Sequence, residues 1–121
     1  FFYPKDDTPG CTIEANDFSA LHNEFLKIGT QVIGISKDTL DSHIKFKNKY
    51  NLTVNLISDT SEEICNTFNV IKEKNMYGKK YLGIERSTFF INSVGILKKE
   101  WRKVSVNDHA KEVLDFIKKF N

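Results

Sequence analysis

The chain has 121 residues, 40% hydrophobic and 28% charged, and its 18 basic and 16 acidic residues leave a formal charge of only +2. This length suits one domain, residues 1–121, built on one hydrophobic core. The balanced charge and scattered lysines argue against a nucleic-acid-binding protein, and no apolar run approaches the roughly 20 residues that span a bilayer.

The first half of the chain alternates between strand and helix patterns. Phe1–Tyr3 resembles the end of a strand without an initiator methionine, so we expect an N-terminal portion of one or two strands, and any targeting signal there, to be missing. Residues 4–10 form a loop. A helix is then predicted from Cys11 to Gly29, because apolar residues recur at three- and four-residue steps. Residues 31–36 predict a buried strand, 40–50 a second helix and 55–58 another strand.

The second half completes an α/β pattern. Residues 60–63, Thr-Ser-Glu-Glu, match a capping box and predict a third helix that carries Cys65. Residues 71–85 predict a long loop with weak strand character. Residues 86–91 and 96–101 form a predicted hairpin, and an amphipathic pattern after Asn107 predicts a last helix. This order suits a thioredoxin-like fold, a central mixed sheet flanked by helices, although other α/β folds share it.

The cysteines and histidines limit the possible chemistry. Cys11 and Cys65 form no C-x-x-C pair, which argues against a zinc site and a thioredoxin-type dithiol. Two cysteines are too few for a disulfide scaffold, so a reducing, cytoplasmic setting fits best. The three histidines lie on separate predicted helices without ligand spacing, which favours surface or capping roles over metal binding.

Cys11 at the start of a predicted helix is the main chemical signal. Unpaired N–H groups and the positive end of the helix dipole favour the thiolate, which is the nucleophilic form of cysteine. A helix end contributes only about 0.3–2 kcal/mol, so a nearby cation should be expected. Arg86 is the candidate, because a guanidinium at the start of an apolar strand needs an anionic partner. The alternative is an ordinary surface arginine.

These residues also resemble a known family. Residues 4–11, Pro-Lys-Asp-Asp-Thr-Pro-Gly-Cys, match the P-x-x-x-T-x-x-C active-site signature of peroxiredoxins. Residues 2–12, 58–59, 76–79 and 83–89 are similar to the bacterioferritin comigratory protein, or peroxiredoxin Q, branch, so the resemblance covers nearly the whole chain. It implies a thioredoxin-dependent antioxidant peroxidase, without a metal or other cofactor, that reduces hydrogen peroxide and organic hydroperoxides. The reductant would be a thioredoxin-like protein or a small thiol, and the enzyme a monomer or weak dimer.

The resemblance assigns a role to each matching residue. Cys11 would attack the peroxide, the Thr8 hydroxyl would hydrogen-bond the peroxide and the thiolate, and Pro4 would shield the pocket. Arg86 would hold the thiolate and polarise the O–O bond, helped by the backbone N–H groups of Gly10 and Cys11. Glu14 matches a position whose carboxylate orients the arginine, although an acidic residue in the first turn of a helix is favourable without any such role.

The sequence departs from the branch where a second cysteine would resolve the oxidised one. Many members carry it five residues after the first, which is Asn16 here, or on the next helix, near Lys47. We therefore expect a one-cysteine cycle with Cys65 as a small buried residue, while a resolving role for Cys65 after local unfolding stays open. Alternatives are a redox sensor or adaptor that passes oxidation to a partner protein, and a disulfide oxidoreductase, which the missing C-x-x-C disfavours.

Overall fold

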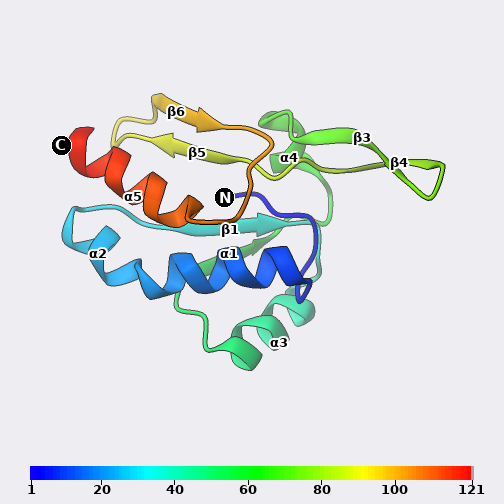
Figure 1. Cartoon of the computed structure of the whole chain (residues 1–121), viewed down its shortest axis with the longest axis horizontal. Coiled ribbons are helices and arrows are strands. Elements are labelled where there is room, and N and C mark those ends of the chain that lie inside the picture. Colours follow the sequence, from blue (N-terminus) through cyan, green and yellow to red (C-terminus); the bar gives the residue numbers. More distant parts are fainter. Residues whose placement is uncertain (121) are drawn as a thin grey trace.

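The computed structural model describes residues 1–120 and has alternating helices and strands (Figure 1). The helices are Pro9–Ala20 (α1), His22–Lys27 (α2), Leu40–Tyr50 (α3), Glu63–Thr67 (α4) and His109–Phe120 (α5). The strands are Ile33–Ser36 (β1), Asn55–Ser58 (β2), Ile71–Met76 (β3), Lys79–Ile84 (β4), Thr88–Ile91 (β5) and Leu97–Trp101 (β6). Within residues 1–120, no helix is both long enough and apolar enough to cross a membrane.

Residues 1–3 join two pairs of strands into one central mixed sheet. Strands β1 and β2 are parallel, and β5 and β6 are antiparallel. Phe2 forms a parallel bridge to Ile35 of β1 and an antiparallel bridge to Ser87, just before β5. The Phe2 N–H donates to the Ser87 carbonyl at 2.8 Å, and the Ile35 N–H donates to the Phe1 carbonyl at 2.7 Å. The predicted mixed sheet is therefore present.

Alternating side chains of residues 1–3 divide the core between the two faces of this sheet. Phe1 and Tyr3 belong to the larger apolar cluster, which also contains buried residues of α1, α3 and α5. Phe2 belongs to a separate cluster with Cys65 of α4 and with residues near the start of β3 and the end of β4. Because successive side chains of an extended segment point to opposite faces, helices cover the sheet on both sides, as predicted.

The structure corrects three of the predicted elements. The first helix begins earlier, at Pro9, and is interrupted at Leu21, so it forms α1 and α2. The capping box is wrong: Glu62 precedes α4 with φ 64°, and the Asp59 carboxylate accepts the N–H groups of Ile64 and Cys65 at 3.1 and 2.7 Å. The predicted helix 40–50 and strand 55–58 are confirmed.

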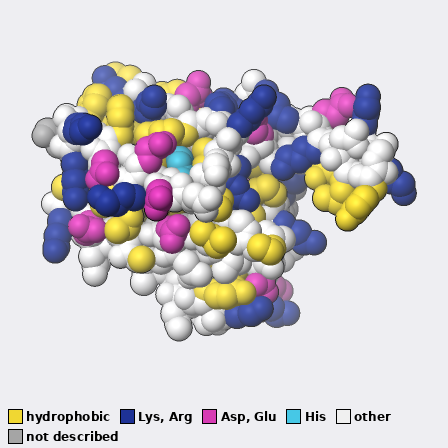
Figure 2. All heavy atoms as spheres, in the orientation of Figure 1, with side chains coloured by type: hydrophobic (Ala, Val, Ile, Leu, Met, Phe, Trp, Pro, Cys, Tyr) yellow, Lys and Arg dark blue, Asp and Glu magenta, His cyan; other side chains and the backbone are white. Residues whose placement is uncertain are grey.

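The third correction is the segment 71–85, which was predicted as a loop. It is a regular hairpin, with Ile71 of β3 paired with Ile84 of β4 and Met76 paired with Lys79. Its two turn residues, Tyr77 and Gly78, have φ of 53° and 78°, as a type I′ turn requires. The hairpin stands out from the body of the molecule (Figures 1 and 2).

Candidate active site

The start of α1 leaves backbone donors free around Cys11. Thr8 is the N-cap residue and Pro9 occupies the first turn, where its missing N–H costs no hydrogen bond. The first main-chain bond of the helix runs from the Thr12 N–H to the Thr8 carbonyl, at 2.9 Å. The N–H groups of Gly10 and Cys11 precede this bond, so they have no acceptor within the helix. The Thr8 side chain makes no cap hydrogen bond to them.

Arg86 reaches this helix start from the other end of the sequence. It lies between the end of β4 and the start of β5, where its carbonyl accepts the Val104 N–H at 3.0 Å. Its guanidinium donates from Nη2 to Cys11 Sγ at 3.3 Å and from Nη1 to Glu14 Oε1 at 2.8 Å. The structure therefore brings the predicted residues Cys11, Arg86 and Glu14 together.

Glu14 lies one turn after Cys11 and is buried, with 1% of its surface exposed. Burial raises the pKa of its carboxyl group, although the positive charge of Arg86 acts in the opposite direction. Its second oxygen, Oε2, has no hydrogen-bond partner among residues 1–120. The carboxylate contacts Arg86 through one oxygen and holds the guanidinium next to Cys11. Because Glu14 is buried, it is not simply a solvent-exposed acidic residue in the first turn of a helix.

Gly10 allows the guanidinium to lie across the helix. A Cβ atom at this position would be 3.1 Å from Arg86 Nη2 and 3.8 Å from Arg86 Cζ. Such a separation is shorter than ordinary van der Waals contact, so a side chain here would require the Arg86 guanidinium to shift by a few tenths of an ångström. The sequence resemblance placed Gly10 at the site for its backbone N–H, and this steric requirement was not foreseen.

We expect Gly10→Ala to slow the reaction of Cys11 with peroxide by about two- to tenfold, part of the ~10²–10³ that a lost donor costs. The added methyl group pushes Nη2 away from Sγ, while alanine favours the helix over glycine. Stopped-flow kinetics with hydrogen peroxide measures the rate, and thermal unfolding checks the fold. Asn16→Ala, on an exposed position of the same helix, is the control. An unchanged rate in Gly10→Ala would mean that the guanidinium position is not limiting.

Thr8 and Pro4 lie near the helix start, and within residues 1–120 neither side chain forms a hydrogen bond with Cys11. The Thr8 hydroxyl donates to the Lys5 carbonyl at 2.8 Å, so its hydrogen is already used within the loop. Its oxygen keeps lone pairs with which it can accept a hydrogen bond. Pro4 is half-buried and directly follows Tyr3, whose side chain is fully buried. The structure thus brings neither side chain into a hydrogen bond with the sulfur.

Cys65 lies apart from this site. It belongs to the cluster around Phe2, whereas Cys11 belongs to the cluster on the other face of the sheet. Both cysteines are free and buried. Burial, together with the neighbouring Asp59 carboxylate, raises the pKa of Cys65 to about 12. The Cys65 side chain is therefore a neutral thiol at physiological pH.

A buried polar network under the active-site loop was missed by the sequence reasoning. Asp6, in the same loop as Thr8, accepts hydrogen bonds from the Tyr3 hydroxyl at 2.6 Å and the Ser42 hydroxyl at 2.8 Å. Its Oδ2 lies 2.7 Å from His43 Nδ1, and His43 Nε2 lies 3.0 Å from the Ile57 carbonyl. Both neighbours of the imidazole are acceptors, so this arrangement favours the cationic form of His43, in which both ring nitrogens donate.

This network also corrects the predicted surface roles of the histidines, because His43 and His109 are only 2% and 4% exposed. The ligand atoms of Asp6, Asp38 and His43 lie within 4.8 Å of one another, which is close enough to hold a metal ion. Hydrogen bonds from protein donors already use both Asp6 oxygens, and Asp38 Oδ2 accepts the Asp6 N–H at 2.9 Å.

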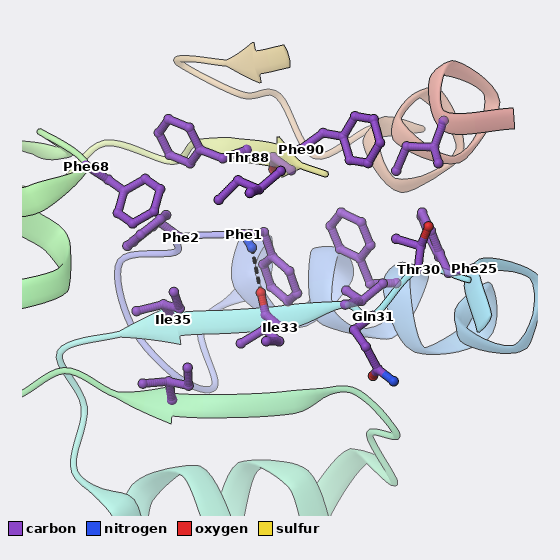
Figure 3. A pocket seen from close by; sticks show the side chains of 16 residues that line it. Phe1, Phe2, Phe25, Thr30, Gln31, Ile33, Ile35, Phe68, Thr88 and Phe90 are labelled. Atoms are coloured by element: carbon purple, nitrogen blue, oxygen red, sulfur yellow. Dashed lines mark hydrogen bonds between the residues drawn. The ribbon is translucent and has the colours of Figure 1, made fainter. Parts of the chain in front are cut away.

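An apolar cavity of about 230 Å³ lies elsewhere, between β1 and β5 (Figure 3). Phe1, Phe2, Ile35 and Phe90 line it, and the N-terminal amino group beside it donates to the Ile33 carbonyl at 2.6 Å. None of the site residues described above lines this cavity. Cys11 and Arg86 therefore lie outside this apolar cavity.

Comparisons with known proteins agree with the motif and with this geometry. Residues 1–100 match the model of the AhpC/TSA family. Peroxiredoxin Bcp of Xanthomonas campestris is 52% identical over 118 residues, which cover 98% of this chain and 74% of that protein. Peroxiredoxin Bcp of Bacillus subtilis is 49% identical over 118 residues, which cover 98% of this chain and 75% of that protein.

A solved structure extends the likeness to three dimensions. The bacterioferritin comigratory protein of Xanthomonas campestris, studied for its alkyl peroxide reduction activity, superposes with a TM-score of 0.93 at 50% identity. The match covers 98% of this chain and 76% of that one, and it confirms the thioredoxin-like fold. The chain belongs to the AhpC/TSA family, in its Bcp or peroxiredoxin Q branch, and is a thiol-dependent peroxidase.

Proposed function

We propose that Cys11 is the peroxidatic cysteine of this peroxidase, on one domain of residues 1–121, and that it reduces hydrogen peroxide and organic hydroperoxides. The observation that carries the proposal is the 3.3 Å contact between Cys11 Sγ and Arg86 Nη2. A guanidinium at this distance stabilises a thiolate, and Glu14 keeps it in place. The alkyl peroxide reduction studied in the Xanthomonas campestris relative supports the organic substrates.

In the first step, the thiolate attacks one oxygen of the hydroperoxide. An S–O bond forms, the O–O bond breaks, and the leaving alkoxide takes up a proton to become an alcohol, or water from hydrogen peroxide. Negative charge grows on the leaving oxygen, so the Arg86 guanidinium and the free N–H groups at the helix start lower the barrier. The Thr8 oxygen accepts the hydrogen bond of the hydroperoxide O–H, and Pro4 limits the access of water.

In the second step, a thiol attacks the Cys11 sulfenic acid. An S–S bond forms and the hydroxyl leaves as water, and a second thiol then releases the Cys11 thiolate and carries away the disulfide. We propose that both thiols come from outside the chain, in a one-cysteine cycle. Cys65 is a buried neutral thiol in the other apolar cluster, and disulfide formation requires Cα atoms within about 7 Å.

Peptide mapping tests this assignment directly. After one equivalent of hydrogen peroxide and a dimedone trap, the peptide that contains Cys11 should carry the label. The peptide that contains Cys65 serves as an internal control in the same sample and should stay unlabelled. Labelling of Cys65 with an unmodified Cys11 would overturn the assignment, whereas labelling of Cys11 alone supports it.

We expect Cys65→Ser to keep turnover within about twofold of the wild-type value when dithiothreitol is supplied, as for a substitution away from the reacting groups. The serine hydroxyl can donate to Asp59 in place of the thiol, so the fold should be retained. Steady-state peroxide consumption measures turnover, alongside non-reducing peptide mapping of the oxidised wild type. A quantitative Cys11–Cys65 disulfide together with lost turnover in the variant would make Cys65 the resolving cysteine.

A further inference from the structure

The β3–β4 hairpin has one face with a composition unlike the rest of the surface. Residues directly opposite in an antiparallel pair share a face, so Lys74 lies beside Tyr81 and Met76 beside Lys79, with Lys72 on the same face. A Cβ atom at Gly83 would meet the Tyr81 ring at 3.2 Å and the Lys74 side chain at 3.3 Å, which confirms this arrangement. We call Lys72, Lys74, Met76, Lys79 and Tyr81 the basic hairpin face.

None of the lysines of this face forms an ion pair with an acidic side chain within residues 1–120, although the charge of Glu85 acts on Lys74. The only ion pair of the hairpin, Lys80 with Glu73 at 3.4 Å, lies on the opposite face. With four lysines and one glutamate, residues 71–84 carry a net charge of +3, whereas the whole chain carries +2. Basic and acidic residues nearly cancel over the rest of the chain, so the net positive charge lies on this hairpin, where it can attract a negatively charged molecule.

Large apolar side chains accompany these charges. Met76 is 55% exposed, Tyr81 43%, and the turn residue Tyr77 98%. Figure 2 shows hydrophobic side chains gathered on the side of the projecting hairpin that faces the start of α1, with basic side chains around them. Tyrosine and methionine are enriched in protein–protein interfaces, and a nearly fully exposed tyrosine gains from a partner that covers it.

The base of the basic hairpin face, at Lys74, lies near the proposed active site. Strand β4 leads through Glu85 directly to Arg86, so the hairpin and the guanidinium share one short stretch of chain. The charges of both Arg86 and Cys11 perturb the pKa of Lys74, which burial and Arg86 together lower. A protein that covers this face as far as Lys74 therefore also lies near Arg86 and Cys11.

We propose that the basic hairpin face docks the reductant, and that this reductant is an acidic dithiol protein of the thioredoxin class. The inference rests on the proposed thiol-dependent cycle, in which an external thiol must reach the Cys11 sulfenic acid. A partner with acidic and apolar surface around its reactive cysteine complements the unpaired lysines and the exposed aromatic rings. A small thiol could contact only a fraction of this area.

The test compares a protein reductant with a small one in charge-reversed variants. Lys72→Glu/Lys79→Glu changes the docking face without touching Lys74 or the site residues. Lys27→Glu/Lys119→Glu makes the same change in charge on exposed positions of α2 and α5. Tyr77→Asn removes the exposed ring and places asparagine before Gly78, a pair that a type I′ turn favours.

Turnover is measured with a purified acidic bacterial thioredoxin and, separately, with dithiothreitol. We expect Lys72→Glu/Lys79→Glu to lower kcat/KM for thioredoxin by at least about tenfold at low salt, through KM, with a smaller loss for Tyr77→Asn. Turnover with dithiothreitol should stay within about twofold in every variant, as expected for surface positions away from the reacting groups. Equal thioredoxin kinetics in the hairpin and control variants would overturn the docking proposal. A wild-type dimer in sedimentation that uses the hairpin as its interface would also overturn it.

A wild-type protein that is inactive with dithiothreitol would instead refute the proposed one-cysteine cycle.

Discussion

Arg86→Met is expected to slow the reaction of Cys11 with hydrogen peroxide by ~10²–10³, the usual cost of losing one donor aimed at developing charge. Methionine keeps much of the side-chain volume but removes both the Nη2 donor to Sγ and the positive charge beside it. The contact with Sγ and the stabilisation of the leaving oxygen are both lost. Stopped-flow measurement of the second-order rate constant, with iodoacetamide alkylation at pH 7, separates the two effects.

Matched variants make the outcome decisive. Arg86→Lys keeps a charge but loses the planar fork that reaches Glu14 and Cys11 together, so its rate should fall between the two proteins. Arg102→Met removes an arginine that donates to the Phe68 and Asn69 carbonyls instead, and Cys11→Ser defines the background. If Arg86→Met fails to fold because Glu14 is left unpaired, Arg86→Met/Glu14→Gln removes that charge. A folded variant with the wild-type rate would assign Arg86 a structural role.

Sequence patterns predicted two elements with the correct boundaries. The helix 40–50 and the strand 55–58 are correct to the residue, because apolar spacing and turn residues give the same boundaries. The hairpin 71–84 was missed because its outer half packs on nothing, so polar and apolar residues do not alternate there. Its type I′ turn holds a tyrosine at positive φ, where asparagine would have signalled a hairpin.

The sequence named the residues of the candidate site but not the geometry in which they meet. The motif around Cys11 and the distant Arg86 could be named from sequence, because the chemistry of a thiolate demands a nearby cation. The steric need for Gly10 and the single-oxygen contact of Glu14 depend on how the guanidinium crosses the helix. No spacing along the chain contains that information, since Arg86 is 75 residues from Cys11.

The contact between His43 and Asp6 could likewise not be predicted from the sequence, because 37 residues separate them along the chain.

The second large effect that we expect comes from breaking this buried pair. Asp6→Asn should lower the free energy of unfolding by about 3–5 kcal/mol, because it leaves the His43 cation buried without its counter-ion. Both side chains are less than 5% exposed, so water cannot replace the lost interaction. The variant should also loosen the loop that holds Thr8.

The neighbouring Asp7 provides a matched control. Its carboxylate also binds two side chains, Lys49 at 2.8 Å and Tyr50 at 2.6 Å, but this group lies at the surface. Asp7→Asn should therefore change stability far less than Asp6→Asn, because solvent screens exposed ion pairs. Urea unfolding at pH 6 compares the two variants with the wild type. Equal losses for both would show that Asp6 contributes no more than a surface carboxylate.

The pH dependence identifies the charge on His43. Burial would lower the pKa of His43, but the hydrogen bond and charge of Asp6 outweigh it, so the pKa lies above its ordinary value of 6.5. The Asp6–His43 pair therefore stabilises the folded state fully below pH 6.5. This stabilisation is lost as the pH rises through the raised pKa of His43. The pKa of Asp6 is lowered, so its own titration matters only below about 3.8. Burial and Asp6 raise the pKa of Tyr3, so Tyr3 stays neutral throughout this range. The negative charge of Asp38 also raises the pKa of His43.

The difference in the free energy of unfolding between the wild type and Asp6→Asn should consequently decrease as the pH rises from 6 to 9. The wild type loses the Asp6–His43 ion pair over this range, whereas the variant has no such pair. Urea unfolding curves at each pH measure the gap, and a titration of the His43 ring protons by NMR locates its pKa independently. The Asp7→Asn gap should stay nearly constant over this range, since both Asp7 and its partner Lys49 keep their charges. A gap for Asp6→Asn that does not change with pH would mean that His43 is neutral, and that hydrogen bonding alone fixes the active-site loop to α3.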